Sequence, residues 1–406
     1  MTSAALTSPS ESESGSARGG RGWLVAAVAV VVLVISLVCA WALYHELHPV
    51  IGRRAFAWGL LFAFVPVVPL AVLFVWLDRL RPEPRWLLIV TFVFGALAAT
   101  FISLQLNGWL AGLIGDRSGP SPRSAVFIAP WVEEAAKATI IFAIVLWRRH
   151  DFNAVVAGVV YGGLAGVGFA FTENIFYYGQ IFQQAIISGE SSATALDGVQ
   201  DLFLFRGLAA PFVHPMFTLV TGVGIGLAVR HRHLGVRIVA PVAGYCGAVV
   251  LHMGYNTIAS FATSDSLAAV YFAILLPTLA ALVTIVIVVR RHERRVIAAR
   301  LHDYTVFGWL KAAHVPFIVS GRGRRRARRY ARRFGKAESQ RLRGFQRAGL
   351  DLGLLRDRLV RGVAGPSELP REGELIAMLT SLRGKVLLPG VSEASNDELS
   401  SAASSW

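Results

Sequence analysis

Long apolar blocks separated by short polar breaks dominate the first three quarters of the chain. A run of about 18 or more apolar residues is long enough to cross the hydrocarbon core of a membrane as a helix. Such blocks predict eight spans, at residues 23–43, 57–77, 86–106, 125–147, 154–175, 207–229, 238–261 and 267–289. The pattern therefore predicts an all-α fold, a polytopic membrane helical bundle with about eight transmembrane helices.

The segments on either side of the predicted bundle, residues 23–290, differ from it in composition. Residues 1–22 are rich in Ser, Gly and Ala and have no apolar periodicity, which predicts a disordered tail. Residues 291–390 are strongly basic with a helical pattern, and we expect them to form a cytoplasmic region. Residues 391–406 are polar, so a second disordered tail is predicted there.

Composition agrees with a membrane protein. Hydrophobic residues make up 54% of the chain and charged residues 16%, whereas soluble domains contain about 25% charged residues. The net charge of +15 would by itself suggest nucleic-acid binding. Because the arginines flank apolar spans or follow residue 290, we expect their partners to be anionic lipid headgroups, and no nucleic acid. Cys39 and Cys246 lie inside apolar spans, so no disulfide framework is predicted.

The arginines also predict the orientation of the bundle. With the N-terminus in the cytoplasm, the inner connections carry Arg79, Arg81, Arg85, Arg148, Arg149, Arg230, Arg232 and Arg237. The outer connections carry fewer basic residues, and those around 176–200 and 262–266 carry none. Positively charged residues stay on the cytoplasmic side of a membrane. We therefore expect a multi-pass protein of the cell membrane with both termini in the cytoplasm.

The fourth predicted span contains two adjacent carboxylates, Glu133 and Glu134, followed by Lys137. Ionisable groups inside a membrane are costly and face the interior of a bundle, so each is a candidate for function. Glu133 and Lys137 are four residues apart and share a helix face, which favours an ion pair between them. Glu134 points about 100° away round the helix and requires another partner or a role of its own.

The fifth span combines a packing face with a third carboxylate. Gly158, Gly162 and Gly166 repeat every four residues, which predicts close packing of this face against another helix. Glu173 falls near the same line on the helix, so we expect it to point into the bundle. Its position near the end of the span is equally typical of an interfacial carboxylate.

The sixth and seventh spans add His214, His252 and Asn256. His252 and Asn256 are four residues apart and therefore lie on one side of their helix. At 1.5 Å per residue, the polar residues of four separate spans come out in the outer half of the membrane. Independent structural ion pairs would have no reason to agree in depth, so we expect one shared site.

Three interpretations of such a site follow from the residues alone. Two histidines and several carboxylates are zinc ligands, although the H-E-x-x-H spacing is missing and His45-Glu46-Leu47-His48 lacks one residue of it. Buried Glu and His residues also form the proton relays of transporters and channels. A catalytically silent scaffold is the third reading. Without further information the residues indicate a buried acid–base site.

The motifs resemble those of the PrsW family, in the wider group of glutamate-dependent intramembrane proteases that includes the CAAX prenyl endopeptidases. The matching motifs are Glu-Glu-x-x-Lys at 133–137, Phe-x-x-Glu-Asn at 170–174 with Phe169 and Phe171 bracketing its aromatic position, His214-Pro, and His-x-x-x-Asn at 252–256. The resemblance covers about residues 57–290. It implies an intramembrane endopeptidase without a cofactor, whose substrate is a membrane-anchored protein cut near the outer face, as in site-1 cleavage of an anti-sigma factor.

The resemblance also implies roles for the six candidate residues. One glutamate of the pair is the general base for a water molecule, and we favour Glu134 because Lys137 shares a face with Glu133. His252 and Asn256 would hold the oxyanion. His214 would orient the water or share its proton, and Glu173 would support the network. The wider group has a histidine at the position of Glu173.

Overall fold

The computed structural model describes residues 12–79, 82–114, 121–148, 155–261, 269, 271–365 and 368–391. Within these ranges the chain forms helices joined by turns, with no strand. The predicted all-α class is confirmed. Helix α1 begins at Ser12, inside the predicted N-terminal tail, while residues 1–11 and most of the predicted C-terminal tail lie outside the described residues.

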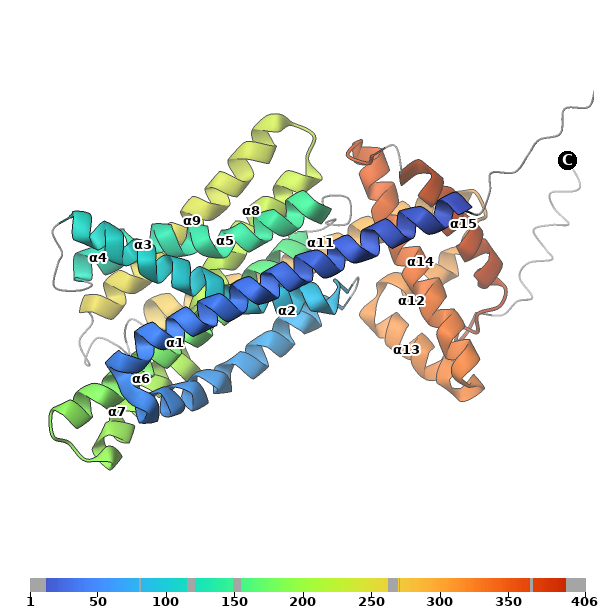
Figure 1. Cartoon of the computed structure of the whole chain (residues 1–406). Helices are drawn as coiled ribbons and strands as arrows, with labels where there is room; N and C mark the ends of the chain where they lie inside the picture. The colour runs from blue at the N-terminus through green and yellow to red at the C-terminus, as the bar shows by residue number, and fades with distance from the viewer. Residues whose placement is uncertain are drawn as a thin grey trace, which may run out of the picture.

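Helix α1 (Ser12–Leu77) contributes two legs that run in opposite directions (Figure 1). The helix reverses at Gly52, whose φ of 74° lies in the left-handed region that glycine adopts without a steric penalty. The two predicted spans at 23–43 and 57–77 correspond to these legs. From Val30 onward, the first leg leaves most of its apolar side chains exposed, as expected for a surface that faces lipid.

The rest of the bundle consists of long apolar helices. They are α2 (Arg85–Val93), η1 (Phe94–Ala99), α3 (Thr100–Leu113), α4 (Pro122–Phe127), α5 (Ala129–Arg148), α6 (Val155–Ile187), α7 (Ser192–Phe203), η2 (Leu204–Ala209), α8 (Val213–Arg230), α9 (Leu234–Phe261), η3 (Tyr271–Leu275) and α11 (Leu276–Val306). Helix α6 is the most central, because nearly every residue from Val155 to Ala170 is buried. The core around it includes Tyr161, Leu164 and Leu219.

Six described helical stretches are long and apolar enough to cross a membrane. The predicted number of eight is therefore not confirmed. The first two predicted spans fall in one continuous stretch, Val30–Leu77, which contains the reversal at Gly52. Helix α5, the fourth predicted span, carries Glu133, Glu134 and Lys137 and is not among the six.

Helices α6 and α8 approach so closely that their main chains touch. A Cβ atom on Gly162 would lie 2.7 Å from the carbonyl oxygen of Thr218, and one on Gly166 would lie 2.6 Å from that of His214. Neither position accepts a larger residue unless the helices separate. The predicted close packing of this glycine face is confirmed, and its partner is α8. The contact fixes the position of His214 relative to α6.

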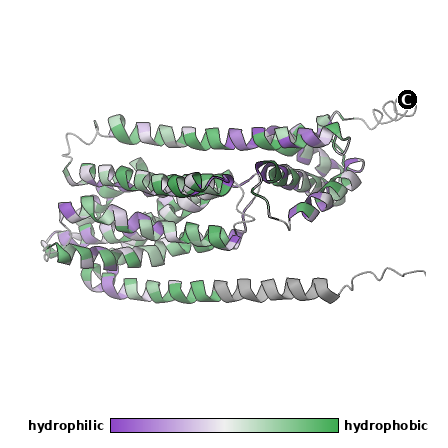
Figure 2. Cartoon of the chain, turned by 90° about the horizontal axis from the view of Figure 1, so that it is seen from above, coloured by the Kyte–Doolittle hydropathy of each residue, from purple (hydrophilic) through white to green (hydrophobic). Residues whose placement is uncertain are grey.

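The chain after residue 290 forms a separate packed layer, the C-terminal unit, made of the second half of α11 and helices η4 (Ala312–His314), α12 (Val315–Val319), α13 (Gly321–Ala331), η5 (Arg332–Phe334), α14 (Lys336–Arg361) and α15 (Leu369–Arg383). It has its own apolar core, which includes Ile297, Leu342 and Phe345. Figure 2 shows apolar residues along the long helices and hydrophilic ones where the chain passes into this unit. Its cytoplasmic location stays a prediction.

The C-terminal unit attaches to one end of the bundle. Asp357 on α14 pairs with Arg230 at the end of α8 and with Arg300 on α11, each at 3.5 Å. The candidate residues lie at the other ends of their helices: Glu133 near the start of α5, His214 at the start of α8 and His252 in the second half of α9. These residues therefore lie at one level of the bundle, whereas their depth and side in the membrane stay predictions.

Candidate active site

Lys137 pairs with Glu134 rather than with Glu133. Its Nζ lies 2.5 Å from Glu134 Oε1 and 4.0 Å from Glu133 Oε2, and it also lies over the ring of Phe169. The predicted ion pair between Lys137 and Glu133 is present, but it is longer than the pair with Glu134. Both Lys137 and Glu134 are fully buried, and opposite charges without water are stabilised most by direct contact.

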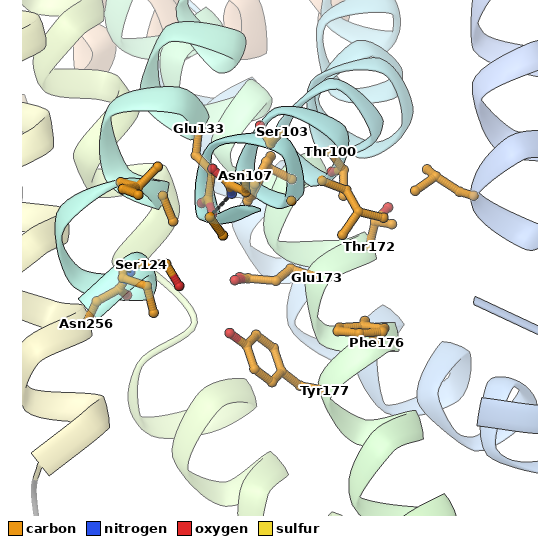
Figure 3. Close-up of a pocket in the computed structure, with 18 of the residues that line it drawn as sticks. Thr100, Ser103, Asn107, Ser124, Glu133, Thr172, Glu173, Phe176, Tyr177 and Asn256 are labelled. Carbon is orange, nitrogen blue, oxygen red and sulfur yellow. Dashed lines mark hydrogen bonds between the residues drawn. The ribbon is translucent and has the colours of Figure 1, made fainter. Parts of the chain in front are cut away.

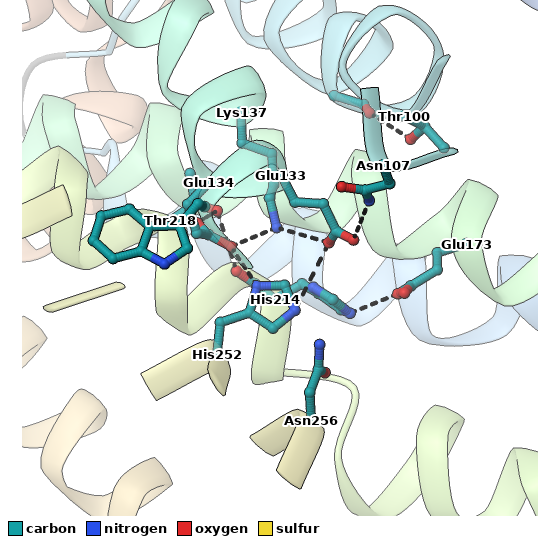
Figure 4. Close-up of polar contacts among 12 residues, drawn as sticks. Thr100, Asn107, Glu133, Glu134, Lys137, Glu173, His214, Thr218, His252 and Asn256 are labelled. Carbon is teal, nitrogen blue, oxygen red and sulfur yellow. Dashed lines mark hydrogen bonds and ion pairs between the residues drawn. The ribbon is translucent and has the colours of Figure 1, made fainter. Parts of the chain in front are cut away.

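Glu134 is held on every side. Thr218 Oγ1 on α8 donates a hydrogen bond to its Oε2 at 3.0 Å, and His252 Nδ1 on α9 lies 3.0 Å from its Oε1 (Figure 4). Together with Lys137, these contacts bind α5, α8 and α9 to one carboxylate. Glu134 thus has the partners that its position on the helix requires.

Glu133 has only long contacts and faces open space. Asn107 Nδ2 on α3 donates to its Oε1 at 3.4 Å, and His252 Nε2 lies 3.7 Å from its Oε2. The carboxylate lines a cavity of about 480 Å³ formed by α1, α3, α4, α5, α6 and α9 (Figure 3). The reason given by the sequence for favouring Glu134 as the base does not hold, because Glu133 is the less engaged member of the pair.

Glu173 and His214 form a second pair of carboxylate and imidazole. Glu173 Oε2 lies 2.6 Å from His214 Nε2, and Arg206 Nη2 donates to the same oxygen at 2.9 Å. Arg206 Nε also donates to Asn174 Oδ1 at 2.8 Å, and its guanidinium lies over the ring of Tyr177. Glu173 points into the bundle, as predicted, and also lines the cavity.

The two histidines lie side by side next to Glu133: His252 Nε2 is 3.7 Å from Glu133 Oε2, and His214 Nδ1 has no hydrogen-bond partner in the part of the chain that the structure describes. Their rings lie edge to face with centroids 5.2 Å apart. Within the described residues, one ligand atom each from Glu133, His214 and His252 lie within 4.8 Å of one another. Two imidazoles and a carboxylate are the donor set of many catalytic zinc sites. Metal-bound histidines also use their other nitrogen to contact a carboxylate, the position that Glu134 and Glu173 occupy here. The residues therefore fit a metal.

Among the described side chains, Asn256 makes no hydrogen bond to the other five candidates, but it lines the same cavity as Glu133 and Glu173. Its Nδ2 donates to the carbonyl oxygen of Ala125 on α4 at 2.8 Å, and the side chain lines the cavity. His252 and Asn256 were predicted to act together. In the structure His252 contacts the buried glutamates, whereas Asn256 forms part of the cavity wall. The structure brings together Glu133, Glu134, Glu173, His214 and His252.

Two residues that contact the cluster, Arg206 and Asn107, were not predicted from the sequence. Arg206 lies in the π-helix η2 and pairs with Glu173; π-helical turns often occur at functional sites. Asn107 directly follows the predicted span at 86–106 and belongs to no recognised motif. A useful signal for Arg206 would have been charge balance, because three buried carboxylates need more than Lys137.

A multi-helix membrane bundle with a buried cluster of carboxylates and histidines beside a cavity defines an acid–base site typical of membrane hydrolases. The model of the PrsW family of intramembrane metalloproteases matches residues 83–288, just over half of the chain, and the chain belongs to this family. The membership inferred from the motifs is confirmed, and the protein is a membrane peptidase. No curated protein and no solved structure matched the chain in the same comparisons.

Proposed function

We propose that the protein hydrolyses a peptide bond of another membrane protein, and that Glu133 takes the proton from the attacking water. The observation that carries this assignment is the difference in engagement among three carboxylates. Glu134 and Glu173 each have partners at 3.0 Å or less, whereas the contacts of Glu133 begin at 3.4 Å. A general base must be able to reach the proton that it removes.

The residues around Glu133 support this chemistry step by step. As the proton moves from the water to Glu133, the water oxygen forms a bond with the carbonyl carbon of the peptide. Glu133 then gives the proton to the amide nitrogen as the carbon–nitrogen bond breaks. Glu134 contacts His252 Nδ1, which leaves His252 Nε2 3.7 Å from Glu133, and Glu173 contacts His214 Nε2. In this proposal His252 and Asn256 stabilise the carbonyl oxygen, as the resemblance implies.

The family description adds a metal to this picture. Glu133, His214 and His252 would hold it, with Glu134 and Glu173 orienting the two histidines. A divalent metal at such a site polarises the peptide carbonyl and lowers the pKa of water. One observation favours the metal-free, glutamic mechanism instead: the ammonium of Lys137 already lies 4.0 Å from Glu133. Glu133 is essential in both mechanisms.

Access and substrate follow from the position of the site. The cavity lies at the end of the bundle opposite the C-terminal unit, and Leu43 and Leu47 on the first leg of α1 form part of its wall. With both termini in the cytoplasm, that end is the outer one. We therefore propose a membrane-anchored substrate cut near the outer face of the cell membrane, such as an anti-sigma factor.

The test is cleavage of a single-pass reporter protein by the full chain in liposomes. We expect Glu133→Gln to reduce cleavage by roughly 10²–10⁴-fold, the range for loss of a general base. Glu46→Gln is the matched control, because this carboxylate is exposed and pairs with Gln105 outside the cluster. Unchanged cleavage by a correctly inserted Glu133→Gln protein would refute the assignment.

A further inference from the structure

A second cavity, which we call the arginine cavity, lies between the membrane bundle and the C-terminal unit. Its volume is about 510 Å³. Two of its arginines come from the bundle, Arg79 after α1 and Arg148 at the end of α5. The others come from the C-terminal unit: Arg324, Arg328, Arg343, Arg347 and Arg371. Against these seven arginines the lining has only Glu83 and Asp351, an excess of five positive charges.

The helices of the C-terminal unit place these like charges together at a cost. Arg324 and Arg328 are four residues apart on α13, as are Arg343 and Arg347 on α14, and like charges at this spacing destabilise a helix. Burial, followed by repulsion from Arg328, Arg294 and Arg79, lowers the pKa of Arg324 to about 10. An anion bound in the cavity would therefore reduce the repulsion among these arginines.

The position of Arg328 is fixed by a buried amide. Arg328 Nε donates a hydrogen bond at 2.8 Å to Gln346 Oε1, and Gln346 Nε2 donates to the carbonyl oxygen of Phe317 at 2.9 Å. Gln346 has no exposed surface. An uncharged partner orients the guanidinium and leaves its charge unneutralised. This arrangement is expected of a binding site and is not required for the packing of α13 on α14.

Tryptophans place the arginine cavity at the level of the membrane surface. Trp86 at the start of α2 and Trp147 at the end of α5 pack with ring centroids 5.7 Å apart. Trp76, at the end of α1, carries the guanidinium of Arg79 over its ring. Arg148 directly follows Trp147, and Arg79 follows Trp76 by three residues, so two arginines of the cavity lie next to tryptophans. Tryptophan side chains are enriched at the depth of the lipid headgroups.

We propose that the arginine cavity binds the phosphate group of an anionic phospholipid from the leaflet next to the C-terminal unit. Guanidinium groups bind phosphate oxygens through two parallel hydrogen bonds, which suits an arginine-lined cavity of this size. Because the lining comes from both the bundle and the C-terminal unit, the headgroup joins them. A cavity of this size between the bundle and the C-terminal unit fits a single lipid headgroup better than a nucleic acid, which needs an extended basic surface.

The test measures lipid retention by the full-length protein in detergent micelles that contain phosphatidylglycerol and phosphatidylcholine. Native mass spectrometry counts the bound lipids on wild-type protein, on Arg324→Gln/Arg343→Gln and on Arg326→Gln/Arg333→Gln. The last variant is the matched control, since Arg326 and Arg333 are exposed residues of the same unit outside the cavity. We expect the cavity variant to bind phosphatidylglycerol about tenfold more weakly, the effect of losing one or more charge-assisted hydrogen bonds.

Each remaining outcome overturns the proposal. Equal loss in both variants would show diffuse attraction of the basic unit to the membrane. Displacement of the lipid by millimolar pyrophosphate would identify a soluble phosphate ligand. Equal retention of phosphatidylcholine would remove the role of the anion. Thermal unfolding checks that each variant is folded, and Arg324→Lys/Arg343→Lys provides a second measurement. That variant keeps the positive charges but cannot form two parallel hydrogen bonds to one phosphate. We expect it to bind with intermediate affinity.

Discussion

The active site and the arginine cavity concentrate charge at opposite ends of the same bundle and balance it in different ways. In the active site, Glu134 and Glu173 are neutralised by Lys137 and Arg206 and oriented toward two histidines. In the arginine cavity, positive charges exceed negative ones by five. The difference indicates that the active site is nearly complete without an external partner, whereas the arginine cavity is not. Only Glu133 remains weakly engaged in the active site, and it marks where chemistry takes place.

Removal of metal has the largest expected effect and separates the two regions. If a metal occupies Glu133, His214 and His252, a strong chelator should lower peptidase activity by roughly 100-fold or more, because the metal would contribute several kcal/mol to carbonyl polarisation. Added Zn²⁺ should then restore the activity. If Glu133 acts as the general base without a metal, the chelator should leave the activity unchanged. The same treatment should leave the retention of phosphatidylglycerol unchanged. The measurements are reporter cleavage and elemental analysis of the treated protein.

Full activity in protein shown to be free of metal would exclude a required metal at this site. It would instead support the glutamic mechanism, in which Glu133 acts on water without a metal. Glu133→Gln should lose activity in either case, because Glu133 is the general base of one mechanism and a metal ligand of the other.

Breaking the central ion pair has the next largest effect. Lys137→Met leaves Glu134 buried without its cation, and loss of one partner of a buried pair costs roughly 3–5 kcal/mol. We expect the free energy of unfolding to fall by that amount, measured by denaturation in mixed micelles. Lys137→Met/Glu134→Gln should recover part of the loss. Arg343→Gln in the arginine cavity removes one repulsive charge and should not destabilise the protein. A loss of stability similar to that of Lys137→Met would show that the charges of the two regions are equally well balanced.

A smaller effect is expected at Arg206, which holds Glu173 and Asn174 in place. We expect Arg206→Gln to lower kcat roughly tenfold through displacement of His214, the size of a charge-assisted hydrogen bond. KM should change little, because Arg206 is not part of the cavity lining. Arg206→Lys should retain part of the activity. An increase in KM with unchanged kcat would show that Arg206 binds substrate instead.

The smallest effect concerns acid and the C-terminal unit. Burial, with smaller contributions from Lys311 and Arg383, lowers the pKa of His314 to about 4. His314 is therefore neutral in the folded protein, and the stability that this provides is present above pH 6.5 and lost as the pH falls toward 4. We expect the C-terminal unit to lose roughly 1 kcal/mol of stability at pH 5. Thermal unfolding at pH 7.5 and 5 measures this, and His314→Leu should reduce the difference; equal pH dependence in both proteins would exclude His314 as its source.

Local pattern predicted much of the fold and of the site. Apolar runs predicted the helices, and the repeat of Gly158, Gly162 and Gly166 predicted a close contact, but not that α8 forms it. The pairing of Lys137 could not be read from helix geometry, because His252 and Thr218 come from other helices and decide which carboxylate turns inward. The core of the C-terminal unit was hidden by its arginines, although Leu342 and Phe345 are fully buried.

The contact between α6 and α8 has a consequence for random mutagenesis. Because Gly162 and Gly166 meet main-chain atoms of α8, an added side chain cannot be accommodated by a change of rotamer. The two helices would have to separate as rigid bodies, and His214 would move away from Glu173. A genetic screen for inactive protein should therefore recover substitutions at these uncharged positions as readily as at the glutamates and histidines, although no glycine touches the substrate.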